Sequence, residues 1–480
     1  MIFYIGNPQN NEDKEIWVNN YLNNHKKSFY LTDAYVICIL IFSLSSLFRD
    51  FALLLHIMKP SKYNYIIKYQ NNDYIFFNGI KKKFIIVPFK LKNLVENFIN
   101  KQENIDNDYQ SFYNKLIDSG LIINDDIDEL KLIQDEQQKI NNQKKYVLTI
   151  LPTYKCNFSC WYCIQNHKDE YMNLDIINRI KLHIKNYLIL HNIKEFSIQW
   201  FGGEPMLCFD TICDISKYAI DFCNKNDITF QNHITTNGYL ITEENSKEMG
   251  NIKFRSYQIT IDGDKENHNK IRNENSNPSF NKILENLLII LKTQPLAIVT
   301  LRFNYTESNI IPERILSDVN NIIPFEFRKR IFVLPRKVWQ VDKTTIDQEL
   351  KRNLFKSFRN SGYNINVDCD ICFDYFPCPD EKKHHHTIFH NGSVSKCTNT
   401  NPEQCLAYLD EFGNICNLRD VNDIFSCIKN SKCRDCKYLP ICMGPCLKSR
   451  NEKTKCVLKI VDSTFEESIM NYCEFMINNT

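Results

Sequence analysis

A regular alternation of apolar runs with helical stretches in the middle of the chain constrains its fold more than any other feature. The six apolar runs lie near residues 147–152, 195–201, 228–235, 255–261, 297–303 and 330–335. Strands that alternate with helices form parallel βαβ units. The predicted fold class is therefore α/β, and six such units predict a partial (β/α)6 TIM-like barrel with its active site at the carboxyl ends of the strands.

Three cysteines follow the first apolar run at a spacing that suits an iron–sulfur cluster. Cys156, Cys160 and Cys163 are separated by three and then two residues. Three thiolates can hold three irons of a 4Fe–4S cube and leave the fourth iron open to a small-molecule ligand. Because the chain has 20 cysteines in 480 residues, this spacing would arise by chance in roughly 3% of such chains. Inert core cysteines are therefore the weaker interpretation.

Glycines and polar residues follow the next three runs. Glycines let a backbone approach a ligand closely, and a carboxylate or exposed carbonyl can accept from an ammonium group. A guanidinium suits a carboxylate because it forms a two-pronged pair, although an isolated arginine near a loop is more often a solvated charge. The candidate binding residues at these positions are Gly202, Gly203, Glu204, Thr236 and Asn237, and Arg272 lies after the fourth run.

Together, the cysteine spacing and Gly202-Gly203-Glu204-Pro205 resemble the motifs of radical S-adenosylmethionine (radical SAM) enzymes. The resemblance implies that an electron from the cluster cleaves SAM to methionine and a 5′-deoxyadenosyl radical. It assigns Gly202, Gly203 and Glu204 to the amino group of SAM. It also implies that Thr260 and Arg272 contact the ribose and carboxylate, and that Tyr162 flanks the adenine. His268 and Arg272 resemble the segment that follows the fourth strand in this family.

A second set of cysteines lies in the last third of the chain and resembles the SPASM domain of many peptide-modifying radical SAM enzymes. That resemblance, which includes Gly392, implies two more 4Fe–4S clusters with eight thiolate ligands. The first auxiliary cluster is assigned Cys372, Cys378, Cys397 and Cys446, and the second Cys433, Cys436, Cys442 and Cys456. Zinc is the competing metal, and Cys369 or Cys405 could replace an assigned ligand. The triplet His384 to His386 is expected to be a solvated loop.

Composition narrows the partners and the compartment. The chain has 59 basic and 57 acidic residues, so bulk charge does not predict a nucleic-acid partner. The N-terminal residues do not show the usual order of a signal peptide, in which basic residues, an apolar stretch and a small-residue cleavage site follow one another. Together with the metal-binding cysteines, this predicts a reducing cytoplasm. The apolar segment between Ala34 and Met58 is interrupted by Arg49 and Asp50 and is shorter than a spanning helix needs. We expect a buried or interfacial helix there, or upstream sequence before a functional start at Met58.

Short strands and helices between residues 59 and 134 predict a small α+β domain of the winged-helix kind. Such domains often bind an extended peptide at a sheet edge, although a packing extension is an equal alternative. The predicted organisation is an apolar extension (1–58), this small domain (59–134), a polar linker (135–145), the radical SAM core (146–345), the SPASM domain (346–460) and a C-terminal helix (461–480).

The resemblance, which covers residues 145 to 460, implies an enzyme that modifies a ribosomally made precursor peptide or a protein. We expect it to form a thioether or carbon crosslink, with reduced ferredoxin or flavodoxin as the electron donor. Sulfatase-maturing relatives carry Gln and Asp where this chain has Phe201 and Thr398, and Thr cannot act as a base at neutral pH. That activity is therefore the less favoured alternative. A cofactor-biosynthesis maturase and a non-catalytic iron–sulfur electron carrier stay open.

Overall fold

The structure is a computed structural model that describes twelve stretches of the chain. These are residues 58–100, 109–165, 167–274, 276–306, 309–338, 340, 348–365, 378, 381–418, 431–444, 456 and 465–479. Predictions for the N-terminal extension, apart from Met58, and for Cys369, Cys372 and Cys446 fall outside these stretches. Within them, every helix is too short or too polar to cross a bilayer.

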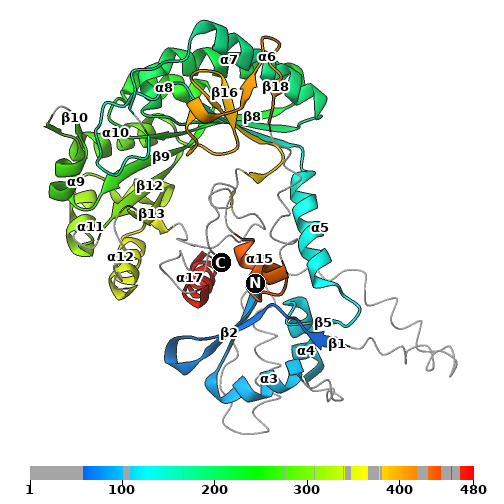
Figure 1. Cartoon of the computed structure of the whole chain (residues 1–480). Helices are drawn as coiled ribbons and strands as arrows, with labels where there is room; N and C mark the ends of the chain where they lie inside the picture. Colours follow the sequence, from blue (N-terminus) through cyan, green and yellow to red (C-terminus); the bar gives the residue numbers. More distant parts are fainter. Residues whose placement is uncertain are drawn as a thin grey trace.

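A large, mostly parallel sheet lies in the upper part of the molecule as drawn in Figure 1. The six predicted strands are present and lie side by side in chain order. They are β6 (Lys145–Leu151), β7 (Glu195–Trp200), β8 (Thr229–Thr236), β9 (Phe254–Asp262), β12 (Ile298–Tyr305) and β13 (Ile331–Lys337). The short β14 (Asn364–Ile365) extends the sheet beyond β13. Beyond β6 lie β15 (His385–Phe389), β16 (Ser393–Ser395), β17 (Ala407–Leu409) and β18 (Ile415–Cys416).

Helices cover the outer face of this sheet (Figure 1). They are α6 (Leu174–Leu190), α7 (Phe209–Lys225), α8 (Glu243–Asn251), α9 (Lys265–Ile271), α10 (Phe280–Thr293), α11 (Pro312–Asn320) and α12 (Gln348–Asn360). Successive side chains of a strand point to opposite faces. On β9, Tyr257, Ile259 and Ile261 lie in the helix-covered core, whereas the residues between them are polar. The inner face of the sheet is therefore available for polar chemistry.

The N-terminal region forms a separate antiparallel structure. The strands β2 (Asn64–Lys68), β3 (Tyr74–Asn78) and β4 (Lys83–Val87) make one sheet, and β1 (Met58–Pro60) pairs with β5 (Ile122–Asn124). The helices α3 (Lys92–Asn100) and α4 (Gln110–Asp118) lie between β4 and β5 in the sequence. The segment predicted as a linker, residues 135–145, is helical as far as residue 141, because it contains the second half of α5 (Glu129–Asn141). Asp128 caps that helix, and Ile133 lies on its buried face.

The N-terminal sheet shares its core with the end of the chain. The last helix, α17 (Phe465–Asn479), and the short α15 (Leu439–Cys442) lie beside β2 in Figure 1. Tyr65 and Phe77 of the sheet pack in one apolar cluster with Ile441, Phe465 and Ile469. The Tyr65 hydroxyl also donates a hydrogen bond to the carbonyl of Lys437. The two ends of the described chain therefore form a single packed unit.

The prediction of a solvated histidine loop is wrong. His385 and His386 belong to β15, which pairs with β6, and His384, His385 and His386 are 7%, 4% and 4% exposed. Their ring nitrogens lie 2.9, 3.3 and 3.2 Å from the hydroxyls of Tyr187, Thr149 and Tyr146. Burial lowers the pKa of all three imidazoles. Neutral rings with hydroxyl partners can be buried at little cost.

Candidate active site

The three clustered cysteines lie in a loop that leaves the carboxyl end of β6. Cys156 and Cys160 are partly buried and Cys163 is exposed, and all three are free thiols. The backbone N–H of Phe158 donates to Cys156 Sγ at 3.4 Å. His167 Nε2 lies 3.1 Å from Cys163 Sγ. The loop therefore presents three thiols from the strand end at which sequence analysis predicts the chemistry.

The double glycine after β7 fits against this cysteine loop. A side chain at Gly203 would bring its Cβ to 2.1 Å from the carbonyl oxygen of Lys155, and Gly202 has φ +130°. The amides of Gly203 and Glu204 donate to the carbonyls of Thr153 and Lys155 at 3.1 and 2.8 Å. The glycines thus permit close contact with the cysteine loop, a different use from the ligand approach that the sequence suggested.

Glu204 lies at the centre of a buried hydrogen-bond network. Its carboxylate accepts from Met206 N at 2.9 Å, from Thr236 Oγ1 at 2.7 Å and from Asn237 N at 2.7 Å. Asn237 in turn donates to Asn157 Oδ1 at 2.7 Å and has Nδ2 3.9 Å from Cys156 Sγ. Burial raises the pKa of Glu204, and these hydrogen bonds oppose the rise. The structure thus brings three predicted binding residues together, with the carboxylate engaged inside the protein.

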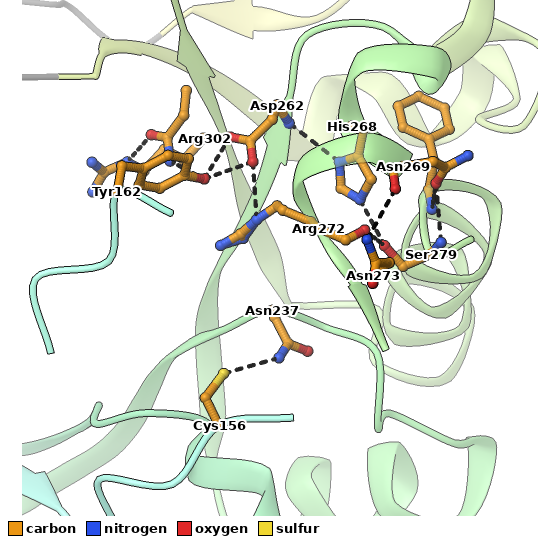
Figure 2. Close-up of polar contacts among 12 residues, drawn as sticks. Cys156, Tyr162, Asn237, Asp262, His268, Asn269, Arg272, Asn273, Ser279 and Arg302 are labelled. Carbon is orange, nitrogen blue, oxygen red and sulfur yellow. Dashed lines mark hydrogen bonds and ion pairs between the residues drawn. The ribbon is translucent and has the colours of Figure 1, made fainter. Parts of the chain in front are cut away.

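Figure 2 shows a second network at the end of β9, centred on Asp262. This carboxylate is 1% exposed and accepts from the Tyr162 hydroxyl at 2.7 and 2.6 Å. Arg272 Nε forms an ion pair with it at 3.3 Å, and Asn304 donates to the Tyr162 hydroxyl at 3.1 Å. Burial raises the pKa of Asp262, whereas Arg272 and Tyr162 lower it. Tyr162, which the resemblance places beside adenine, is joined here to Asp262.

His268 fixes the backbone that carries Arg272 (Figure 2). Its Nδ1 accepts from the amide of Asp262 at 3.2 Å, so the proton lies on Nε2, which is 2.9 Å from Ser279 Oγ. Ser279 donates onward to the carbonyl of Arg272 at 2.6 Å. Burial and nearby Arg272 hold the pKa of His268 well below its usual value. His268 is therefore a neutral support for Arg272.

The arginine site fits the carboxylate of SAM. Arg272 is 12% exposed, and its buried Nε and Nη1 have no well-oriented hydrogen-bond acceptor among the described residues. A carboxylate can accept from two guanidinium nitrogens at once. The Thr260 hydroxyl, on the same strand as Asp262, also makes no hydrogen bond within the described ranges, although the residue is only 7% exposed. Both residues therefore keep donors for a ligand.

The thiols fit an iron–sulfur cluster by their chemistry. In the described part of the chain, no three His, Cys, Asp or Glu side chains are grouped to hold a metal ion. Burial raises the pKa of Cys156 to about 12 and also raises that of Cys160, whereas Arg272 lowers both. Thiols must lose their protons to bind iron. Binding of a cluster would therefore release the protons of Cys156 and Cys160, two half-buried thiols that lie near the positively charged Arg272.

Sequence reasoning missed part of the Asp262 network. Asp262, Arg302 and Asn304 were not singled out, although they occupy inner-face positions at the ends of β9 and β12. Arg302 Nε donates to Asn304 Oδ1 at 2.9 Å. The available signal was the alternation of polar residues along an otherwise apolar strand, which runs Ser256, Gln258, Thr260 and Asp262 on β9.

The auxiliary cysteines are described only in part. Burial raises the pKa values of Cys433 and Cys442, and the nearby thiols of Cys436 and Cys456 raise both further. Cys378 and Cys397, from the first assigned set, lie within the described ranges and are partly buried. Cys405 Sγ lies 3.6 Å from the carbonyl of Asn401 and packs beside Leu151, Tyr154 and Phe389.

A cavity of about 470 Å³ opens on the inner face of the sheet. Its polar wall comes from four strands and consists of Gln199, His233, Thr235, Ser256, Gln258 and Thr300. Thr149 of β6 and Thr398, which follows Cys397, complete this wall. Phe201 borders the same space. The two positions at which the chain departs from the sulfatase-maturing pattern therefore lie around one cavity.

Known proteins match part of this sequence. Residues 150–310 match the radical SAM superfamily. The radical SAM cyclopropyl synthase TigE of Paramaledivibacter caminithermalis is 27% identical over 270 residues, which are 47% of this chain and 56% of that protein. The chain thus spans about half the length of the curated relatives it matches.

Two solved structures give more distant matches. The structure of anSMEcpe with bound AdoMet and the Cp18Cys peptide is 18% identical, with a TM-score of 0.49, and the match covers 70% of this chain and 97% of that one. Streptococcus suis SuiB bound to the precursor peptide SuiA is 17% identical, with a TM-score of 0.41 and coverage of 86% and 99%. The matched family model leads to one conclusion: residues 150–310 of this chain are a radical SAM domain.

Proposed function

We propose that this enzyme is a peptide maturase that removes a hydrogen atom from a ribosomally made precursor and forms a thioether or carbon crosslink. The observation that carries the proposal is the grouping of the cysteine loop, the Glu204 network and the available Arg272 donors at the carboxyl ends of β6 to β9. The relative TigE is named as a cyclopropyl synthase. A cyclopropyl ring closes through a carbon–carbon bond, which favours the carbon crosslink.

The proposed cofactors are SAM and three 4Fe–4S clusters. Cys156, Cys160 and Cys163 would hold the SAM-binding cluster, which, when reduced, supplies the electron that cleaves SAM. The eight cysteines of the two auxiliary sets would hold the others, and the mutual effects among Cys433, Cys436, Cys442 and Cys456 support the second set. Arg272 and Thr260 would bind SAM through the donors that they keep, and the inner sheet face would form the wall of a partial barrel.

The N-terminal region would capture the precursor. Its sheet of β2, β3 and β4 has two edge strands, β2 and β4, and an extended peptide can add a strand to such an edge. This is the winged-helix role expected from the sequence. A reduced ferredoxin or flavodoxin would deliver the electron, and cysteines that bind iron–sulfur clusters suit a reducing cytoplasm.

The alternatives make different demands on the site. A sulfatase-maturing activity would need a base at position 398, where Thr398 borders the cavity. An electron carrier would not need a buried arginine with available donors. A cofactor-biosynthesis maturase would act on a small molecule and would not need the N-terminal peptide-binding edge.

Anaerobic reconstitution with iron and sulfide tests the proposal. We expect about twelve irons per chain, since three 4Fe–4S clusters hold that number. Incubation with SAM and dithionite should yield 5′-deoxyadenosine, and Cys160→Ala should abolish it. Cys223→Ala is the matched control, because Cys223 lies on the buried face of α7, outside the cysteine loop. Zinc in place of iron, or full clusters without 5′-deoxyadenosine, would contradict the proposal.

A modified precursor should weigh two hydrogens less than the unmodified one, with its backbone intact. High-resolution mass spectrometry of a candidate precursor before and after reaction measures this difference. An unchanged mass, as epimerisation would give, would exclude the crosslink while leaving the radical SAM chemistry in place.

A further inference from the structure

The half-open cavity on the inner sheet face has a wall of uncharged, hydrogen-bonding side chains. Its hydrogen-bonding side chains come from β6, β7, β8, β9 and β12, and none of its lining residues is Asp, Glu, Lys or Arg. The side chains of Trp200, Ile234 and Tyr257, which also border it, are buried on the helix side and are 1%, 2% and 1% exposed. The cavity therefore offers hydrogen bonds without a permanent charge.

Its size and chemistry restrict what can enter. A volume of about 470 Å³ lies within the range of small-molecule sites and can hold a side chain with its peptide backbone. An apolar guest would leave several wall groups without partners, and a site built for hydrogen bonds rejects such a guest strongly. A charged guest would lose its hydration without finding a counter-charge. A polar, uncharged guest satisfies both conditions.

His233 is the wall residue best placed to hold this guest. Its Nδ1 lies 2.5 Å from Ser256 Oγ on the neighbouring strand, which fixes the ring. Its Nε2 has no hydrogen-bond partner among the described residues, and His233 borders the cavity. The neighbouring inner-face residues, Ser197 and Gln199 of β7 and Ser256 and Gln258 of β9, do not titrate in the neutral range. The remaining titratable wall residue, Tyr257, donates its hydroxyl away from the cavity to Gln294.

We propose that this cavity holds the precursor residue from which hydrogen is removed, that this residue is Asn, Gln, Ser or Thr, and that His233 positions it through Nε2. The proposal rests on the function proposed above and names the substrate residue class for the same site. The position of the cavity supports it, because the inner-face polar residues of β9 continue from Ser256 at the cavity to Asp262 beside Arg272.

Deuterium transfer provides the test. Reconstituted enzyme is incubated with SAM, dithionite and capped Gly-Gly-Xaa-Gly-Gly peptides, in which a perdeuterated Xaa is Asn, Gln, Ser, Thr, Val, Leu or Asp. When a carbon–deuterium bond of Xaa breaks, the deuterium enters the methyl group of 5′-deoxyadenosine and is counted by mass spectrometry. We expect transfer from one or more of the first four residues at least tenfold above the other three, the factor that one lost hydrogen bond to a buried group produces. Equal transfer, or none from any peptide, overturns the proposed residue class.

Variants of His233 test its positioning role. His233→Phe should lower the deuterium transferred per 5′-deoxyadenosine by about tenfold, because its ring cannot hydrogen-bond. Gln231→Leu is the matched control, since Gln231 is exposed two residues earlier on the same face of β8 and does not border the cavity. An unchanged ratio in His233→Phe overturns the role of His233.

The pH dependence of deuterium transfer distinguishes a positioning role of His233 from a role in packing alone. Burial lowers the pKa of His233 below 6.5, so the ring is neutral at pH 7 and gains a proton only in more acidic solution. Transfer per 5′-deoxyadenosine should be constant above pH 6.5 and fall below it, and His233→Gln should remove this fall while keeping most of the transfer. An identical profile in both proteins contradicts the proposal. Failure to form 5′-deoxyadenosine at any pH would instead count against the proposed function itself.

Discussion

At the residue scale, Arg272 has the most demanding environment of the site. Its guanidinium is largely buried, it forms an ion pair with Asp262, and two of its nitrogens keep no well-oriented acceptor in the described ranges. An arginine in this position binds a carboxylate better than a lysine can, because its planar fork offers parallel donors. The support from His268 and Ser279 holds the backbone of this arginine in place.

Arg272→Lys should weaken SAM binding by roughly ten- to a hundredfold, because one charge-assisted hydrogen bond contributes about 1.5–3 kcal/mol. Anaerobic titration calorimetry of the reconstituted protein measures the affinity. Arg314→Lys is a suitable control, since Arg314 also pairs with acidic residues of this region but is 55% exposed. Equal SAM affinities for the Arg272 variant and the unchanged protein would rule out this contact.

At the element scale, the six central strands could be predicted because each combines an apolar outer side with turn or polar signals at its ends. The observed bounds differ from the expected ones by one or two residues, as with β8 at Thr229–Thr236. The ends of these strands also carry most of the candidate site. What the sequence did not reveal was which polar residues face one another, because the partners Tyr162 and Asp262 lie 100 positions apart.

The strand β15 shows why part of the sheet could not be predicted. Three consecutive histidines predict an exposed loop unless hydroxyl partners are known to surround them. Those partners, Tyr146, Thr149 and Tyr187, belong to β6 and α6, 197 to 240 residues earlier in the chain. Burial of His385 and His386 therefore depends on tertiary contacts, which a local pattern does not contain.

The neighbouring His183 gives this region a pH dependence. Burial lowers its pKa from 6.5 to about 4, and its ring bonds to the Tyr146 hydroxyl at 2.8 Å and to the carbonyl of Gly413 at 2.9 Å. Unfolding frees the ring to bind a proton, so acid favours the unfolded state as pH falls from the unfolded pKa toward 4. This residue should lower the free energy of unfolding by about 2 kcal/mol between pH 7 and pH 5.

His183→Gln should reduce the pH dependence of stability by that amount. Chemical unfolding at the two pH values gives the change in the free energy of unfolding for the variant and for the unchanged protein. Contributions from other groups cancel when one change is subtracted from the other. The same loss of stability in both proteins would show that His183 does not titrate on unfolding.

At the scale of the whole molecule, the N-terminal sheet depends on the last helix of the chain. Ile469 of α17 is fully buried against Tyr65 and Phe77. Ile469→Ala should cost about 2–5 kcal/mol, the usual range for truncating a large core side chain. Hydrogen exchange followed by mass spectrometry should then show faster exchange in β2, β3 and β4, with α10 unchanged.

Met470→Ala is the matched control for this prediction. Met470 is the next residue of α17, is only partly buried and does not belong to the shared apolar cluster. Equal exchange in the sheet of both variants would mean that α17 is not needed to hold the N-terminal region.

The shared core of β2 to β4 and α17 also determines when this region can finish folding during synthesis. The sheet is complete on the ribosome once Val87 has been added, yet Cys473, one of its core partners, is made 386 residues later. At a synthesis rate of about 5–20 residues per second, the aromatic face of the sheet stays uncovered for roughly 20–80 s, until α17 has been made. The sheet is therefore made before the central domain but completed after it, and a nascent chain stalled before α17 would expose Tyr65 and Phe77 to chaperones.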